Sequence, residues 1–563
     1  MDIQRNLLTI SLVAISAILY FKWIDYSAIT EQGLSPEARV ADTGVPSTPT
    51  SQMNGQDGVP TTPTNSSALT GDLPSVPGTQ AVSSLDSLII VETDMVRATI
   101  NTNGGVIESL ELKNYALTLD YPEQGFPLLK KSAVETFVAQ DGLLSTTTDG
   151  SPTHKTQYQS SGLRYSINGQ DQVLVPLTWR SGSGVEFIKT FTFRNDSFLV
   201  DIDYRVNNQS DAPWTGYLYA QFNRSIPADS GGGFGRLPSY TGGAYYTTED
   251  KYQKVDFGDM DDANLDIENK GGWVAMLQHY FVGAWIPGDE VNKFYTSMNK
   301  QTGLYRVGYK TTVPVQIEVG QLGNLSTRAY LGSKDQSRLK IVQESGVAGL
   351  TRSVDYGFLT FIADPLFTVL SWIHDVVGNW GWAIILLTIL IKLMFYPLSA
   401  ASYRSMGKMK KLQPRMATLK ERYKDDRQKF QVEMMAMYKK EKVNPAGGCL
   451  PILIQIPVFI ALYWVLLESV EMRHAPFALW WVDLSAKDPY YVLPVLMGVS
   501  MFFMQKLNPA PMDDIQKKVM MIMPFALTFL FMTFPQGLVL YWVVNNVLTM
   551  AQQWFNYRQQ ENG

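Results

Sequence analysis

Residues 382–397 read Trp382-Ala-Ile-Ile-Leu-Leu-Thr-Ile-Leu-Ile-Lys-Leu-Met-Phe-Tyr-Pro397. The stretch is almost wholly apolar and belongs to the apolar run at about 376–398, whose length suits a helix that crosses a bilayer. Its one charge, Lys392, would cost about 3 kcal/mol or more at the centre of a lipid-facing helix. One interpretation is that Lys392, about six residues or roughly 9 Å from the inner end, snorkels to the headgroups. The other is that it faces a wet cavity between helices, because Thr388 lies one turn earlier on the same face.

Four further apolar stretches follow this one, at about 450–470, 491–507, 519–534 and 536–555. The last carries a polar stripe, because Tyr541, Asn545 and Thr549 recur every four residues and Gln552 and Gln553 come next. Such a stripe lines a polar groove, or it only joins helices through hydrogen bonds. Gln455, in the preceding stretch at 450–470, fits either arrangement.

The chain before these stretches divides into three parts. The apolar run at 7–23 lacks a following small-x-small cleavage site, which predicts an uncleaved signal anchor with its N-terminus inside. Residues 27–85 are rich in Pro, Ser, Thr and Gly, which is typical of a flexible linker. From about 86 to 345 the pattern is that of strands, with Phe198, Val200, Ile202, Tyr204 and Val206 alternating with mostly polar residues. Many short strands predict a large antiparallel β-sandwich.

A single basic block stands in an otherwise acidic chain of net charge −5. Residues 399–443 contain 13 Lys/Arg and 5 Asp/Glu, so the block is +8 and the rest of the chain is −13. Such a block is typical of a cytoplasmic loop, a headgroup contact or a nucleic-acid contact. Six spans with both termini inside place every short basic loop in the cytoplasm, as the positive-inside rule requires. Pro414 interrupts the block near its start and a turn is expected at 424–426, which together predict a helical hairpin.

Other features limit the function. Asp364 to His374 has one apolar face, which suits a helix lying on the membrane surface. No His or Asp lies within the five C-terminal stretches, which argues against an intramembrane protease. Four His and one Cys, scattered along the chain, predict no structural metal site, and the Gly-rich segments lack a phosphate-loop pattern. A solute transporter or channel remains an alternative, although no inverted repeat relates the halves of the membrane region.

The residues assembled so far resemble the YidC/Oxa family of membrane protein insertases, and most closely its Gram-negative bacterial YidC type. The resemblance covers essentially the whole chain. It rests on these segments: Asp375-Val-Val-Gly-Asn-Trp-Gly381, Tyr396-Pro-Leu398, Glu441-Lys-Val-Asn-Pro-Ala-Gly-Gly-Cys449, Gln455-Ile-Pro457, Ala475-Pro-Phe-Ala-Leu-Trp480, Asp488-Pro-Tyr-Tyr491 and Phe534-Pro-Gln-Gly-Leu538.

The resemblance implies a polytopic α-helical membrane protein with six spans, a five-helix insertase core around a hydrophilic groove, and a periplasmic β-supersandwich. It implies these parts: signal-anchor span 1–26, linker 27–85, periplasmic domain 86–350, interfacial helix 351–375, span 376–398, cytoplasmic hairpin 399–445, further spans 446–557 and short tail 558–563. The groove cation, commonly arginine in the family, matches Lys392. Thr388 matches a family threonine, and Tyr541 and Trp542 match an aromatic pair.

The function implied is an insertase and chaperone that moves hydrophobic segments of nascent proteins into the bacterial inner membrane. It would act alone or with the Sec translocon, and without a cofactor. The expected groove residues are Lys392, Thr388, Gln455, Tyr541, Trp542 and Asn545. The expected contacts of the hairpin with nascent chains or ribosomes are Arg404, Lys408, Lys410, Lys411 and Arg415. The tail after 557 carries only Arg558, unlike the long basic tail of some members, and no nucleic-acid sequence preference is expected.

Overall fold

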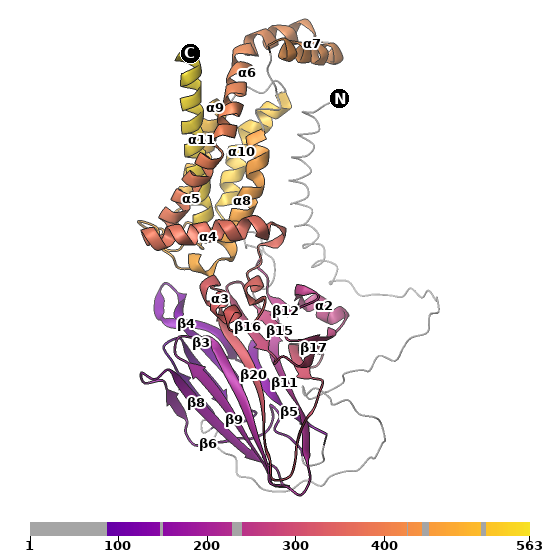
Figure 1. Cartoon of the computed structure of the whole chain (residues 1–563). Coiled ribbons are helices and arrows are strands. Elements are labelled where there is room, and N and C mark those ends of the chain that lie inside the picture. The colour runs from indigo at the N-terminus through magenta and orange to yellow at the C-terminus, as the bar shows by residue number, and fades with distance from the viewer. Residues whose placement is uncertain are drawn as a thin grey trace, which may run out of the picture. The chain divides into compact units, whose positions relative to one another are not determined.

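The computed structural model describes residues 87–146, 150–227, 239–424, 426–441, 450–507 and 514–562 (Figure 1). The predicted signal anchor at 1–26 and linker at 27–85 lie outside these ranges. The described chain divides into two compact units, a β-rich unit up to Val354 and a helical unit from Asp355 onward. This division follows the change in residue pattern near 350.

The β-rich unit contains two sheets. The strands of the nine-stranded sheet, in spatial order, are β13 (Lys251–Val255), β12 (Gly242–Thr247), β15 (Trp273–Leu277), β16 (Phe281–Ile286), β20 (Leu322–Ser333), β10 (Leu199–Asn208), β9 (Val185–Arg194), β8 (Gln172–Arg180) and β6 (Gln159–Ser160). Those of the eleven-stranded sheet are β14 (Asp266–Lys270), β17 (Val291–Asn299), β18 (Leu304–Thr311), β11 (Trp214–Ser225), β5 (Thr136–Ser145), β4 (Tyr121–Lys131), β3 (Val106–Thr118), β2 (Val96–Asn101), β1 (Leu88–Glu92) and β7 (Arg164–Ser166), with β19 (Val315–Ile317) beside β11. Two short helices, α2 (Phe257–Asp262) and α3 (Gln336–Glu344), belong to this unit.

The period-two pattern is confirmed in the hairpin of β9 and β10. Val200, Ile202, Tyr204 and Val206 are buried, and the two strands pair in antiparallel register on either side of residues 195–197. The prediction of a purely antiparallel sandwich is wrong at one edge, where β7 pairs with β1 in parallel. That edge is three residues long, and an alternation pattern carries no information on strand direction.

A buried ion pair lies between the two sheets. Lys189 of β9 donates to Asp141 of β5 at 2.8 Å, and the side chains are 0% and 1% exposed. The hydroxyl of Tyr204 donates to the other Asp141 oxygen at 2.7 Å, and Lys189 also donates to the carbonyl of Gly105 at 2.7 Å. Because a buried charge is tolerated only when it is paired and hydrogen-bonded, this cluster specifies how the two inner faces meet.

The β-rich unit ends just after the short helix η3 (Leu350–Ser353). The elements of the helical unit are η4 (Gly357–Leu359), α4 (Thr360–Val377), α5 (Trp380–Met394), α6 (Tyr396–Arg422), α7 (Arg427–Lys440), α8 (Leu450–Glu468), η6 (Val470–Met472), α9 (Val492–Leu507), α10 (Asp514–Phe531) and α11 (Gln536–Asn562). In Figure 1, α4 lies across the direction of α5, α8 and α11, with buried residues on one face. Phe358, Phe361, Trp372 and Val376 are exposed in or beside it.

The helix expected over 376–398 has different bounds. Gly378 adopts φ = 67° and ends α4, and Asn379 then caps α5 by accepting a hydrogen bond from the Trp382 amide at 3.1 Å. At the other end, α5 and α6 meet at Phe395 with a 66° bend. Pro397 sits in the first turn of α6, where a missing amide hydrogen is tolerated. The Asn379 cap and the bend at Phe395 therefore set the two ends of α5.

By length and composition, one unbroken helix in the described ranges suits a membrane crossing, at Gly357–Val377, and α5 with α6 suits a second crossing as a bent pair. Shorter apolar helices cover Gln455–Glu468, Val492–Leu507 and Lys518–Phe531. The count of six spans thus remains a prediction.

The basic block forms a hairpin of α6 and α7. Its core consists of Leu412, Met416, Met434 and Tyr438, and Arg415 pairs with Glu441 at 2.8 Å. The turn lies where it was expected, between Arg422 and Arg427. The expected interruption at Pro414 is wrong, because α6 continues through this residue.

Candidate functional site in the helical unit

Lys392 is the centre of a polar cluster that joins α5, α8 and α11. Its Nζ donates to Oγ1 of Thr549 at 2.8 Å and to Oε1 of Gln455 at 3.4 Å. The residue is only 7% exposed, so the ammonium lies inside the helical unit. The structure therefore favours the interpretation that Lys392 faces neighbouring helices over the interpretation that it snorkels outward.

The acceptors of Lys392 are themselves held in place. Nε2 of Gln455 donates to Oδ1 of Asn545 at 2.7 Å, and the Thr549 hydroxyl donates to the Asn545 carbonyl at 2.6 Å. Nε2 of Gln552 donates to the Lys392 carbonyl at 3.3 Å. Because Asn545 and Thr549 are one turn apart on α11, both reach the same face of α5 and α8.

The charge of Lys392 is not neutralised within this cluster. Its hydrogen-bond acceptors are a hydroxyl and an amide, and no ion pair joins it to an acidic side chain of the described residues. An ammonium has three N–H donors, and the two hydrogen bonds to side chains use two of them. The described residues also contain no group of three or more His, Cys, Asp or Glu side chains suited to hold a metal ion. The cluster thus offers one positive charge and one remaining donor to an anionic group.

Thr388 does not join the cluster. It is 1% exposed, and its hydroxyl donates to the Ile384 carbonyl of its own helix at 2.6 Å. A threonine in a helix often satisfies its hydroxyl in this way, because the carbonyl four residues earlier is within reach. The one-turn spacing of Thr388 and Lys392 is therefore not enough to predict that the two side chains share a site.

The two predicted aromatic residues form a layer next to the cluster. The rings of Tyr541 and Trp542 pack on Phe459 of α8, with centroid distances of 5.9 and 4.4 Å, and Trp542 also packs edge-on against Phe531 of α10. Tyr541 is 2% exposed, whereas Trp542 is half-buried. The aromatic pair thus lies between the polar cluster and the start of α11.

A second polar contact lies on α11 beside the polar stripe. Nδ2 of Asn546 on α11 donates to Oγ of Ser500 on α9 at 3.0 Å, and both residues are buried. This bond joins two helices and involves no charge, so it fits the interpretation of interhelical hydrogen bonding. Asn546 was not expected in a site, and its only signal in the sequence is that it follows Asn545.

Several segments that carry the family resemblance meet at the end of the unit where α5 begins. Nδ2 of Asn379 donates to the carbonyls of Pro476 and Phe477 at 3.1 Å each, and Phe477 packs directly against Gly381, where a Cβ atom would lie 2.1 Å from its ring. Nearby, the side chain of Gln536 donates to the Lys487 carbonyl at 3.1 Å. Asp488 accepts from the amide of Leu493 at 2.8 Å. Hydrogen bonds between side chains and the backbone therefore join these segments at this end of the helices.

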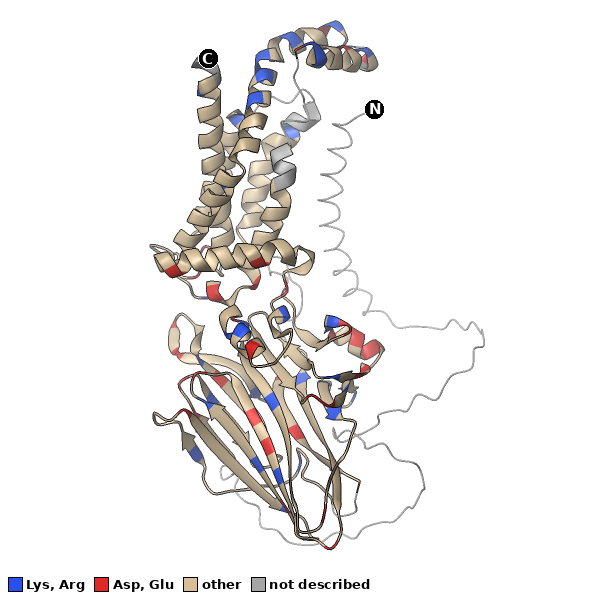
Figure 2. Cartoon of the chain, viewed as in Figure 1, with Lys and Arg blue, Asp and Glu red and all other residues tan. Residues whose placement is uncertain are grey.

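The predicted basic contacts lie mainly along one side of α6. Arg404, Lys408, Lys411 and Arg415 are exposed and are spaced four, three and four residues apart, so they share one helix face. Lys410 points elsewhere, with its Nζ 5.6 Å from the ring centroid of Tyr557 on α11. Figure 2 shows the concentration of Lys and Arg along α6 and α7 compared with α5 and α11.

Comparisons with known proteins match the whole described chain. The family model described as 60Kd inner membrane protein matches residues 372–562, and the YidC periplasmic domain model matches residues 88–369. The protein named Membrane protein insertase YidC of Azotobacter vinelandii is 44% identical, over 100% of this chain and 99% of the relative. Those of Nitrosococcus oceani and Methylobacillus flagellatus are each 49% identical, over 84% and 91% of this chain and 86% and 92% of the relatives.

Solved structures also match, among them the following two. One, titled as an active YidC insertase crystal structure with the first transmembrane domain resolved, has 18% identity and a TM-score of 0.37 over 83% of this chain and 92% of that chain. A galactose mutarotase related enzyme from Lactobacillus acidophilus has 11% identity and a TM-score of 0.30 over 43% of this chain and 97% of that chain. The family models and the full-length relatives are sufficient to place the sequence: this chain belongs to the YidC family of membrane protein insertases.

Proposed function

We propose that this insertase moves hydrophobic segments of nascent proteins into the inner membrane by way of the polar cluster between α5, α8 and α11. The observation that carries the proposal is that the Lys392 ammonium is buried among apolar helices with neutral acceptors only. An uncompensated charge in such a place is costly, which makes it a site for function rather than for stability. The natural ligand of Lys392 is an acidic group in the translocated part of a substrate.

The physical mechanism divides the substrate between two environments. Its polar segment exchanges water for the polar side chains of the cluster, so it enters the membrane without full desolvation. Its apolar segment moves along the outer faces of α5 and α11, where Trp382, Leu386, Leu390, Leu393 and Val547 are exposed. Burial of that apolar segment in lipid supplies the free energy, so no nucleotide is required.

The topology we propose has six spans with both chain termini in the cytoplasm and the β-rich unit in the periplasm. The +8 block supports this orientation, because basic loops stay on the cytoplasmic side. The exposed apolar side chains of α4, together with its direction across the other helices in Figure 1, support a position in the membrane interface. Under this proposal α5 and the helices from α8 to α11 form the five-helix core.

The α6–α7 hairpin is proposed to receive nascent chains or ribosomes on its basic face. The side chains of Arg404, Lys408, Lys411 and Arg415 are exposed, and a single-sign row of charges attracts acidic chains and phosphates at long range. A partnership with the Sec translocon is proposed from the family alone. A solute transporter is disfavoured, because a solute has no need of a basic arm of this length.

Site-specific photocrosslinking tests the proposed path. A photoreactive amino acid at position 542 or 549 is expected to crosslink to a stalled nascent membrane protein. The same group at Thr368 on α4, where the side chain is exposed, serves as the control and is expected to give no product. Equal crosslinking at all three positions would contradict a path through the polar cluster.

A further inference from the structure

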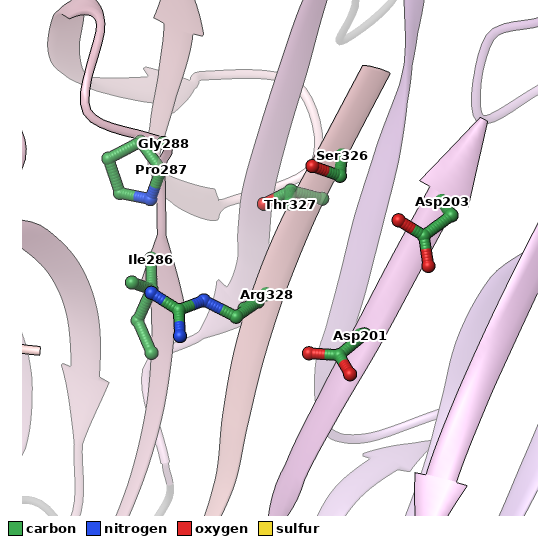
Figure 3. Close-up of a pocket in the computed structure, with 8 residues that line it drawn as sticks. All are labelled: Asp201, Asp203, Ile286, Pro287, Gly288, Ser326, Thr327 and Arg328. Atoms are coloured by element: carbon green, nitrogen blue, oxygen red, sulfur yellow. The ribbon is translucent and has the colours of Figure 1, made fainter. Parts of the chain in front are cut away.

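A pocket on the outer face of the nine-stranded sheet is lined by two acidic side chains and one basic side chain. It encloses about 200 Å³ and is lined by Asp201 and Asp203 of β10, Ser326, Thr327 and Arg328 of β20, and the turn Ile286, Pro287 and Gly288 after β16. Figure 3 shows both carboxylates extending from β10 toward β20 and the guanidinium of Arg328 beside Ile286. The pocket thus has a sheet floor and one wall made by the turn.

Strand register fixes the positions of these charges. Asp201 lies opposite Arg328, and Asp203 lies opposite Ser326, two residues further along the same face. Asp203 and Arg328 are therefore diagonal neighbours in an antiparallel pair. Because Arg328 extends from β20 toward Ile286 and Asp203 extends from β10 toward β20, a ligand that contacts both charges has to reach across β20 (Figure 3).

One acidic and one basic side chain of the pocket take no part in the ion pairs of the sheet. Asp201 pairs with Arg194 of β9, and this pair is partly exposed. Neither Asp203 nor Arg328 forms a hydrogen bond or ion pair through its side chain with another residue of the described chain. Desolvation, followed by the neighbouring charge of Asp201, raises the pKa of Asp203, and the charge of Arg194 opposes this shift.

These charges select a class of ligand. A simple anion at Arg328 would meet two carboxylates, and a simple cation at Asp203 would meet the guanidinium, so each half alone is disfavoured. We propose that this pocket binds a small zwitterion, with its ammonium on Asp203 and its phosphate or carboxylate on Arg328. Arg328 can hold an oxyanion through two parallel N–H donors, and Ser326 adds a hydroxyl beside the ammonium. The volume fits a headgroup-sized molecule and is smaller than the roughly 300–1,000 Å³ of pockets for drug-sized ligands.

The experiment is a calorimetric titration of the full chain in nanodiscs of anionic phosphatidylglycerol with phosphoethanolamine as the probe. Inorganic phosphate and ethanolamine are titrated separately as the two halves. We expect phosphoethanolamine to bind at least about tenfold more tightly than either half, since only it satisfies both charges. Asp203→Asn and Arg328→Gln should each weaken its binding about tenfold, whereas the exposed control changes Glu249→Gln and Arg164→Gln should leave it unchanged.

Two outcomes overturn the proposal. The first is equal affinity of phosphoethanolamine and of either half, and the second is equal affinity of the four variants. A further titration in nanodiscs that contain phosphatidylethanolamine distinguishes the source of the ligand. Competition by the lipid assigns the pocket to a lipid headgroup, and an unchanged affinity assigns it to a soluble zwitterion. Because the pocket lies in the β-rich unit, a negative result leaves the proposed role of Lys392 unaffected.

Discussion

The Nζ atom of Lys392 on α5 lies 2.8 Å from the hydroxyl oxygen of Thr549 on α11. Lys392 lies in the last turn of α5, and this contact directs its ammonium toward the interface with α8 and α11. The position of the charge is therefore set by three helices together, and its chemistry depends on residues far apart in the sequence.

Thr549→Val is expected to reduce the insertion of substrates with acidic translocated tails about tenfold. The change keeps the shape of the side chain and removes an acceptor of a charged hydrogen bond, which is worth roughly 1.5–3 kcal/mol. Insertion into proteoliposomes is measured with tails that differ only in Asp versus Asn. Thr549→Ser should restore activity, and the exposed control Thr368→Val should have no effect. An equal loss for both tails would indicate a purely structural role for Thr549.

The buried pair of Lys189 and Asp141 is expected to make the β-rich unit sensitive to single changes. Asp141→Asn leaves a buried ammonium without its counter-ion, which costs roughly 3–5 kcal/mol. The double change Lys189→Met with Asp141→Leu should recover most of this loss. The stability of the β-rich unit in both variants is measured by urea unfolding of the full chain, with pulse proteolysis as the detection method. The control is Glu108→Gln, which breaks an exposed pair with Lys131 and should cost less than about 1 kcal/mol. A double variant as unstable as Asp141→Asn would contradict this account.

The β-rich unit is expected to lose stability between pH 7 and pH 5 through His154. Burial lowers the pKa of His154 to about 4, and its Nδ1 lies 2.7 Å from the Tyr219 hydroxyl. The Tyr219 oxygen accepts the amide N–H of His154 at 3.1 Å, so its own hydrogen is available to Nδ1 of a neutral ring. The depressed pKa means that the unfolded state binds the proton first as the pH falls. Stability is then fully present above about pH 6.5 and declines as the pH falls toward 4, by about 2 kcal/mol at pH 5.

The pH dependence is measured by the same urea unfolding at pH 7.5, 6 and 5. In His154→Gln, the amide can still accept from Tyr219 but does not titrate, so this component of the pH dependence should disappear. A variant with the same slope of stability against pH as the unchanged protein would assign the effect to other groups.

The basic face of α6 is expected to govern binding of the hairpin to anionic partners. Changing Arg404, Lys408 and Lys411 to Gln removes three charges from one exposed helix face without affecting the hairpin core. Cosedimentation with ribosomes that carry a nascent membrane protein should fall at least about fivefold at low salt, and the difference should shrink at high salt because ions screen exposed charges. Changing Lys439 and Lys440 on α7 to Gln is the control. If the α6 variant and the α7 variant bind ribosomes equally well, the basic face of α6 has no specific role in this binding.

The sequence is sufficient to predict that one part of the chain is β-rich and the other helical, because both follow from local periodicity. Alternation over 198–206 predicted a β-strand with one buried face. The helix boundary at Gly378 and Asn379 was not predicted, because the span was expected to begin at 376. The parallel pairing of β7 is not visible, because strand direction depends on partners elsewhere in the chain. Lys189 shares its strand face with Phe187 and Phe191, and this position in a buried register is the one signal of its ion pair.

The candidate site was predicted in part. Lys392, Gln455 and Asn545 come together as expected, and the four-residue spacing already placed Thr549 on the same stripe. Thr388 does not join them, because a local hydrogen bond within its own helix satisfies its hydroxyl. Periodicity gives the face of a helix, but the partner that a side chain selects on that face is decided by tertiary contacts.

The most direct test of the central claim replaces Lys392 by Arg, Gln and Ala and measures insertion of matched substrates in proteoliposomes. The substrates differ only in whether the translocated tail carries Asp or Asn. Lys392→Arg keeps the charge and should insert acidic tails within about threefold of the unchanged protein, whereas Lys392→Gln and Lys392→Ala should lose at least about tenfold on acidic tails and little on neutral ones. If the Gln and Ala variants insert acidic and neutral tails equally well, Lys392 does not receive the acidic segment and the account is wrong.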